Sequence, residues 1–93
     1  MKYILQVVPE ALDDIQQSVD YYNEQQKGLG KRFNAVINDT FTRIKKYPFS
    51  ASFAYGDARY KVVDKFPYII IYRIRGNIIL IARVFNTHQR PDY

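Results

Sequence analysis

The pattern of apolar residues in the first half of the chain predicts two helices. Apolar side chains first recur every three or four positions, at Leu12, Ile15, Val19 and Tyr22. This spacing places them on one face of a helix running from Pro9 to about residue 26, with Pro9 in the first turn. A second helical series, ended by Pro48, consists of Phe33, Val36, Ile37, Phe41 and Ile44. Because residues 27–30 form a short break, we expect the two helices to lie antiparallel as a hairpin.

Runs of β-branched and aromatic residues predict strands on both sides of this hairpin. These runs are residues 2–8, 59–63, 66–75 and 78–85. The segment 49–57 has no clear period, and we expect it to be a loop that leads into the next strand. The predicted element order is β-α-α-β-β-β, and the fold class is α+β.

The last two predicted strands are joined by Gly76 and Asn77, a two-residue hairpin signal. This turn would pair Arg75 with Ile78, Arg73 with Leu80, and Ile70 with Arg83. One face then carries Ile70, Tyr72, Ile74, Ile79, Ile81, Arg83 and Phe85. The other face carries Ile69, Ile71, Arg73, Arg75, Ile78, Leu80, Ala82 and Val84. Since both faces are apolar, we expect the helices to cover one and a protein partner the other.

We expect the helix residues that face the sheet to form the core. They are Leu12, Ile15, Val19, Phe33, Ile37, Phe41 and Ile44. With 93 residues, 47% of them hydrophobic and 25% charged, the whole chain, residues 1–93, is expected to be one domain. It has no cysteine and one histidine, so we expect neither a metal nor another cofactor. No apolar run is long enough for a membrane span, so a cytoplasmic location is expected.

Charge is distributed unevenly along the chain. Residues 1–26 hold one basic residue against five acidic ones, a net charge of −4. Residues 27–93 hold thirteen basic residues against four acidic ones, a net charge of +9. Clustered positive charge attracts polyanions, so the expected partner is either a nucleic acid or an acidic protein segment. A solvated basic surface without any partner is the alternative.

Short motifs spread over nearly the whole chain resemble those of the RelE/ParE toxin family, also described as plasmid-stabilisation proteins. The motifs are Pro9-Glu10-Ala11, Tyr21-Tyr22, Gly28-Leu29-Gly30, Arg59-Tyr60-Lys61, Phe66-Pro67-Tyr68 and His88-Gln89-Arg90-Pro91, with Tyr93 at the end. The resemblance implies an antiparallel sheet packed on an α-helical hairpin. It also implies the toxin of a bacterial type II toxin-antitoxin pair, silenced when a segment of a cognate antitoxin lies across its surface. We expect that antitoxin to be acidic and to bind the sheet face with Arg59, Lys61, Arg73 and Arg83.

The family has two main branches with different chemistry. RelE-like members are ribosome-dependent endoribonucleases that cleave mRNA with lysines, arginines and a C-terminal tyrosine. Lys61 and Tyr93 resemble two of these residues, but Val63 and Ile69 stand where that branch has cations. ParE-like members bind DNA gyrase and stabilise its cleaved DNA complex without catalysis of their own, and the motifs at 66–68 and 88–91 are closer to theirs.

The resemblance therefore favours a ParE-like toxin that binds DNA gyrase and is not an enzyme. One alternative is an mRNA endoribonuclease acting on the ribosome. Its candidate catalytic residues would be Lys61, Arg83, His88, Arg90 and Tyr93, with histidine and tyrosine exchanging the proton. The other alternative is a degenerate member that binds its antitoxin and is no longer toxic.

Overall fold

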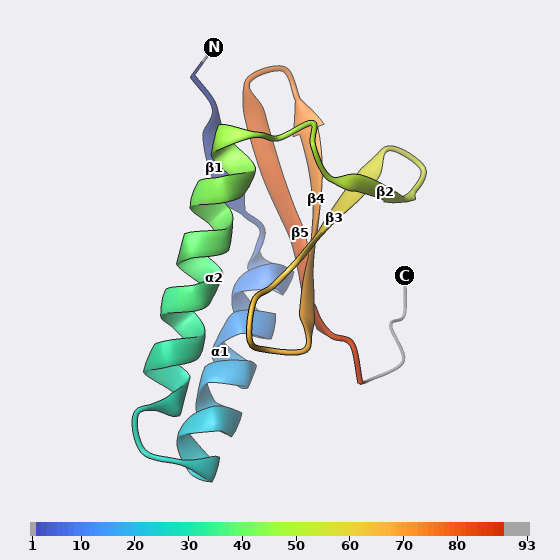
Figure 1. Cartoon of the computed structure of the whole chain (residues 1–93). Helices are drawn as coiled ribbons and strands as arrows, with labels where there is room; N and C mark the ends of the chain where they lie inside the picture. Colours follow the sequence, from blue (N-terminus) through green and yellow to red (C-terminus); the bar gives the residue numbers. More distant parts are fainter. Residues whose placement is uncertain (1, 89–93) are drawn as a thin grey trace.

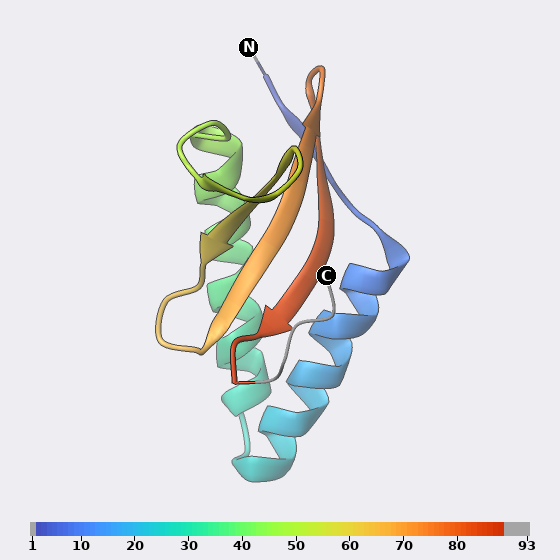
Figure 2. The ribbon, with the colours of Figure 1, turned by 90° about the vertical axis from the view of Figure 1, so that its right-hand side faces the viewer.

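The computed structural model describes residues 2–88, in which two helices pack on one side of a five-stranded sheet (Figures 1 and 2). The elements in chain order are β1 (Ile4–Val7), α1 (Pro9–Gln25), α2 (Leu29–Lys46), β2 (Ser52–Tyr55), β3 (Ala58–Val62), β4 (Tyr68–Arg75) and β5 (Ile78–Asn86). The predicted α+β class and the packing of the sheet on a helical hairpin are confirmed. No helix in this part of the chain combines the length and apolar character needed to cross a membrane.

Two glycines explain the tight turn between the helices. Gly28 has a φ of 84°, in the left-handed region that residues with a Cβ rarely adopt. Gly30 lies directly against α1, where an added Cβ would collide with the carbonyl oxygen of Val19 and the side chain of Asn23. The Gly30 N–H also donates to Asn23 Oδ1 at 2.8 Å. The two glycines thus allow the helices to approach closely in an antiparallel hairpin.

The sheet has the order β1-β5-β4-β3-β2. Strands β3, β4 and β5 are antiparallel as predicted, and β2 pairs antiparallel with β3. Strand β1 runs parallel to β5, so the expectation of an entirely antiparallel sheet is wrong at this edge. The strand β2 was also not predicted, because residues 49–57 were expected to be a loop. It is a four-residue edge strand with mostly exposed side chains, and such a strand lacks the apolar alternation that marks a half-buried one.

The β4–β5 hairpin has the predicted register next to its turn and a different one further on. Arg75 pairs with Ile78 and Arg73 with Leu80, as expected. A bulge then shifts the pairing, so that Ile70 lies opposite Val84 and not opposite Arg83. The bulge brings Val84 into the core between the sheet and the helices, although it was expected on the other face.

The core lies between the helices and the sheet. Of the helix residues expected there, Phe33, Ile37 and Ile44 are fully buried. Ile15, Val19 and Phe41 are partly buried against the same cluster. Leu12 is 53% exposed, so its assignment to the core is wrong. Ala11 and Ser18 occupy the buried positions of α1 instead, and small side chains there let the helix lie close to its neighbours.

Candidate functional site

The four basic residues expected to bind a partner lie on different sides of the sheet. Arg59 is paired with Tyr72 and Lys61 with Ile70, and both partners belong to the core on the helix side. Directly opposed residues share a face, so Arg59 and Lys61 lie on the helix side of β3, next to the edge strand β2. Arg73 alternates with the inward-facing Tyr72 and lies on the outer face, the side without helices.

Arg59 holds the loop between α2 and β2. Its guanidinium donates to the carbonyl oxygens of Phe49 at 3.1 Å and Ala51 at 2.6 Å. The same group lies over the rings of Phe49, at 5.5 Å from the centroid, and Phe53, at 4.1 Å. A second anchor comes from the buried Tyr72 hydroxyl, which donates to the carbonyl of Pro48 at 2.7 Å. Arg59 therefore stabilises the α2–β2 loop in addition to contributing a positive charge to the surface.

Arg73 and Arg75 share one carboxylate, that of Asp57 in the β2–β3 turn. Arg73 Nε lies 3.2 Å from Asp57 Oδ1, and Arg75 Nη1 lies 2.8 Å from Oδ2. Desolvation would raise the pKa of Asp57, but hydrogen bonds and Coulomb attraction from Arg75 and then Arg73 outweigh it and leave the pKa below its usual value. The Arg73 guanidinium also lies 5.4 Å from the ring centroid of Tyr55. This exposed group has two positive charges against one negative charge.

Arg83 binds Asp14 on α1, a contact that the sequence did not predict. Arg83 Nε and Nη2 donate to the two carboxylate oxygens at 2.8 and 3.0 Å. The backbone N–H of Val84 donates to Asp14 Oδ2 at 2.9 Å. Strand β1 pairs with β5 only as far as Ile81, so β1 provides no acceptor for the backbone N–H of Val84. The carboxylate of Asp14 accepts this hydrogen bond instead.

Three of the residues that would serve a nuclease lie in the described part of the chain, one on β3, one on β5 and one beyond the end of β5. Lys61 is on the helix side of β3, Arg83 is bound to Asp14, and His88 is exposed beyond the end of β5. The His88 backbone N–H donates to Asn86 Oδ1 at 2.8 Å. Arg90 and Tyr93 lie outside the described residues. Within residues 2–88, no three His, Cys, Asp or Glu residues lie together in a way that could hold a metal ion.

The two apolar residues at expected cation positions are placed differently. Val63 is only 3% exposed and belongs to the hydrophobic core. Ile69 is a partly buried residue of β4, paired with Val62 and Phe85. A charged side chain at position 63 would be buried away from water, which costs free energy unless the charge is paired.

Comparison with known proteins agrees with this architecture. The family model described as ParE toxin of type II toxin-antitoxin system, parDE, matches residues 5–91. A solved structure described as the chromosomal ParDE TA system from P. aeruginosa aligns with a TM-score of 0.82, over 91% of this chain and 96% of that chain. The two sequences are 15% identical, so this likeness shows the fold alone. No curated protein sequence matches the chain. Because the family model spans nearly the whole sequence, the chain belongs to the ParE toxin family of type II toxin-antitoxin systems.

Proposed function

We propose that this toxin acts in the cytoplasm by binding DNA gyrase and stabilising its cleaved DNA complex, without cutting RNA itself. The observation that carries the proposal is the burial of Val63 where the ribonuclease branch has a cation. Charge builds up on the phosphate when a phosphodiester is cleaved, and a buried apolar side chain cannot neutralise it. Each missing electrostatic contact of this kind typically raises the barrier by about 2.7 to 4 kcal/mol.

The contacts of Arg83 support the same proposal. A substitute cation for cleavage would have to present its guanidinium to the substrate phosphate. In this chain two nitrogens of Arg83 face the carboxylate of Asp14, which is itself mostly buried. Turning Arg83 toward a phosphate would leave Asp14 without its charge partner, and breaking such pairs costs free energy.

We also propose that a cognate acidic antitoxin silences the toxin by covering the outer face of the sheet. This face carries partly buried apolar side chains, among them Ile78 and Leu80, next to the cation Arg73. Val62 on β3 is largely exposed. An apolar surface bordered by arginines suits an acidic segment with apolar side chains. Arg59 and Lys61 lie on the helix side, so they would contact only a segment that continues around the β2–β3 edge.

The proposal is tested with purified gyrase, supercoiled plasmid and ATP. We expect the full-length toxin to inhibit supercoiling and to cause linear plasmid to accumulate after the gyrase is denatured and digested. Prior addition of the antitoxin should abolish both effects. A parallel reaction with ribosomes and a defined mRNA should leave the mRNA intact.

Two other outcomes would overturn gyrase binding in favour of the alternatives. Cleavage of ribosome-bound mRNA that is lost in both His88→Ala and a chain ending before Tyr93 would identify an endoribonuclease. Binding to the antitoxin without an effect on gyrase, mRNA or growth would identify a toxin that has lost its activity.

A further inference from the structure

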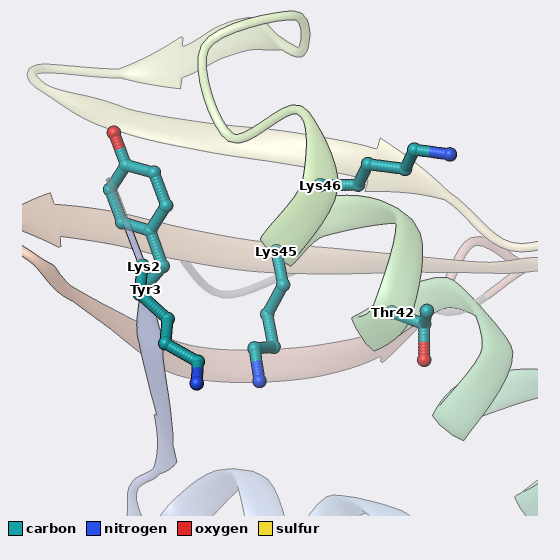
Figure 3. A pocket seen from close by; sticks show the side chains of 5 residues that line it. All are labelled: Lys2, Tyr3, Thr42, Lys45 and Lys46. Atoms are coloured by element: carbon teal, nitrogen blue, oxygen red, sulfur yellow. The ribbon is translucent and has the colours of Figure 1, made fainter.

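Three lysines lie at the end of the molecule where β1 begins and α2 ends, and the side chains of Lys2 and Lys45 approach each other there. A pocket of about 350 Å³ is lined by Lys2 and Tyr3, just before β1, and by Thr42, Lys45 and Lys46 of α2 (Figure 3). The ammonium groups of Lys2 and Lys45 are directed to the same side of the pocket, while Lys46 extends from the other side of the helix end (Figure 3). No acidic residue lines this pocket.

The positive charge of the pocket is not neutralised by the rest of the described chain. Within residues 2–88, every ion pair involves an arginine, and none involves Lys2, Lys45 or Lys46. Lysines in the last turn of α2 are favoured by the negative end of the helix dipole, which accounts for Lys45 and Lys46 individually. It does not account for Lys2, which comes from a different part of the chain. Lys2 and Lys45, which are directed to the same side without a carboxylate between them, repel each other, and a bound anion would relieve this repulsion.

Exposed aromatic rings continue from this pocket over the loop that follows α2. The ring of Tyr3, a pocket residue, meets the ring of Phe49 edge to face at a centroid distance of 6.5 Å. Arg59 then connects Phe49 with Phe53, since its guanidinium lies over both rings. Tyr47, Phe49 and Phe53 are 61%, 61% and 59% exposed. Phe49 and Phe53 share the Arg59 guanidinium, and the Tyr47 ring centroid lies 5.6 Å from the Lys46 ammonium. Each of the three rings thus has a cation beside it and still leaves most of its apolar area in water.

We propose that these cations and rings form one binding surface for single-stranded nucleic acid, which we call the basic–aromatic strip. The strip consists of Lys2, Lys45, Lys46, Tyr47, Phe49 and Phe53. Lysines along such a surface neutralise backbone phosphates, and exposed rings provide faces on which unpaired bases stack. A duplex keeps its bases stacked internally and would use the lysines without the rings. An acidic peptide without apolar side chains would likewise leave the rings without a role.

The strip is separate from the outer face of the sheet proposed for the antitoxin, although Arg59, which an antitoxin segment would meet only around the β2–β3 edge, lies over Phe49 and Phe53. The strip does not depend on gyrase as the target. It lies at the helix side and the β2 edge, whereas the antitoxin is proposed on the outer face of the sheet. A strand bound here would therefore be a second ligand of the toxin. Its binding can be measured in the absence of gyrase and of the antitoxin.

The lysines are tested by the anisotropy of a labelled oligothymidine of about twelve nucleotides, within the usual site size for single-strand binding. The double substitution Lys45→Gln/Lys46→Gln is compared with Lys27→Gln/Lys31→Gln, which removes the same charge at the hairpin end of α2. We expect the first pair to weaken binding at least about ten-fold at low salt and to reduce the salt slope by about 1.4, or 0.7 for each lost phosphate contact. The control pair should have a much smaller effect.

The rings are tested in the same assay with Tyr47→Leu and Phe49→Leu. Leucine keeps an apolar side chain but offers no flat face, so we expect each change to weaken binding about five-fold or more. Tyr21→Leu on α1 is the matched control, because Tyr21 is also an exposed aromatic residue. Thermal melting of every variant establishes that the fold is retained.

Three results would overturn the proposal. Equal weakening by both lysine pairs would show that only net charge matters. Equal affinity for a duplex of the same length, together with unchanged binding by the leucine variants, would show that unpaired bases are not recognised. The absence of measurable oligothymidine binding at low salt would show that the strip does not bind single strands.

Discussion

Two arginine–carboxylate contacts in this toxin use the same chemical groups in opposite surroundings. Arg83 contacts Asp14, whose side chain is 15% exposed, between β5 and the first turns of α1. Arg73 and Arg75 contact Asp57, whose side chain is 60% exposed, in the turn between β2 and β3. Asp14 also accepts a backbone hydrogen bond from Val84.

The comparison indicates that Arg83 stabilises the fold, whereas Arg73 can leave its carboxylate at little cost in stability. The carboxylate of Asp14 is mostly out of water and has three donors from β5, so each lost donor leaves a poorly solvated charge. The carboxylate of Asp57 remains hydrated when either arginine leaves it, and exposed pairs of this kind contribute little to stability. The sequence predicts the same role for Arg73 and Arg83, because both are cations of the same predicted hairpin.

The largest effect that tests this comparison is expected from the carboxylates themselves. Asp14→Ala should lower the free energy of unfolding by about 3 kcal/mol, because Arg83 and the Val84 N–H lose their acceptor in a partly buried site. Asp57→Ala should leave the stability almost unchanged. Urea unfolding of both variants measures the difference. Equal losses would show that the two contacts are energetically alike and would remove the basis of the comparison.

A smaller effect is expected when the arginines are replaced. Arg83→Met keeps an apolar stem but removes two hydrogen bonds to Asp14, so we expect a loss of about 1 to 2 kcal/mol. Arg73→Met should not change the unfolding midpoint. In a double-mutant cycle, Arg83→Met should add little to Asp14→Ala, because the first change has already removed the shared contact. Additive losses would mean that the Arg83–Asp14 contact carries no coupling energy.

The third prediction concerns the rate at which the antitoxin binds. Arg73→Glu should slow association with the acidic antitoxin about ten-fold at low ionic strength, and the difference should shrink as salt is added. Lys31→Glu makes the same change of charge at the hairpin end of α2 and serves as the control. Stopped-flow measurements at several ionic strengths compare them. If Lys31→Glu slowed association as much as Arg73→Glu, the outer face would have no special part in docking.

The smallest effect concerns the protonation of Asp57. Its pKa is lowered from the ordinary value of 3.8 by Arg75 and Arg73, against an opposing effect of desolvation. Since the folded pKa is depressed, the stabilisation by these pairs is present above the ordinary pKa and is lost as the pH falls through the folded value. Carboxyl NMR titration should give a pKa below 3.8, and Arg75→Met should bring it back toward that value. A pKa unaffected by Arg75→Met would contradict the assigned cause.

Much of the fold could be predicted from short stretches of sequence. The periodic apolar residues located both helices, and Gly76 with Asn77 located the β4–β5 turn and the first pairs beside it. These features depend on residues that are close in the chain, so local spacing is enough to indicate them. The strand β2 was missed because its exposed edge position leaves no such spacing. Leu12 was misplaced because the small residues Ala11 and Ser18, and not the larger apolar one, face inward.

The positions of the candidate site residues depend on contacts between distant segments, which local sequence patterns do not reveal. Of the four cations expected to act together, the structure puts Arg59 and Lys61 on the helix side and Arg73 on the outer face, a division that follows from the strand register. Asp14 and Arg83 are 69 residues apart, and their contact exists because β1 ends before β5 does.

The sequence by itself determined the two helices, four of the five strands, the family resemblance and the polarity of charge, since each is a property of composition or of neighbouring residues. Only the tertiary structure decided which strands are neighbours, where the bulge shifts the β4–β5 register, and which arginine is bound to a buried carboxylate. Only the tertiary structure brought Lys2 to Lys45 across the end of α2. The physical reason is that these arrangements are fixed by packing between segments distant in the chain, whereas periodicity and turn signals report only on residues a few positions apart.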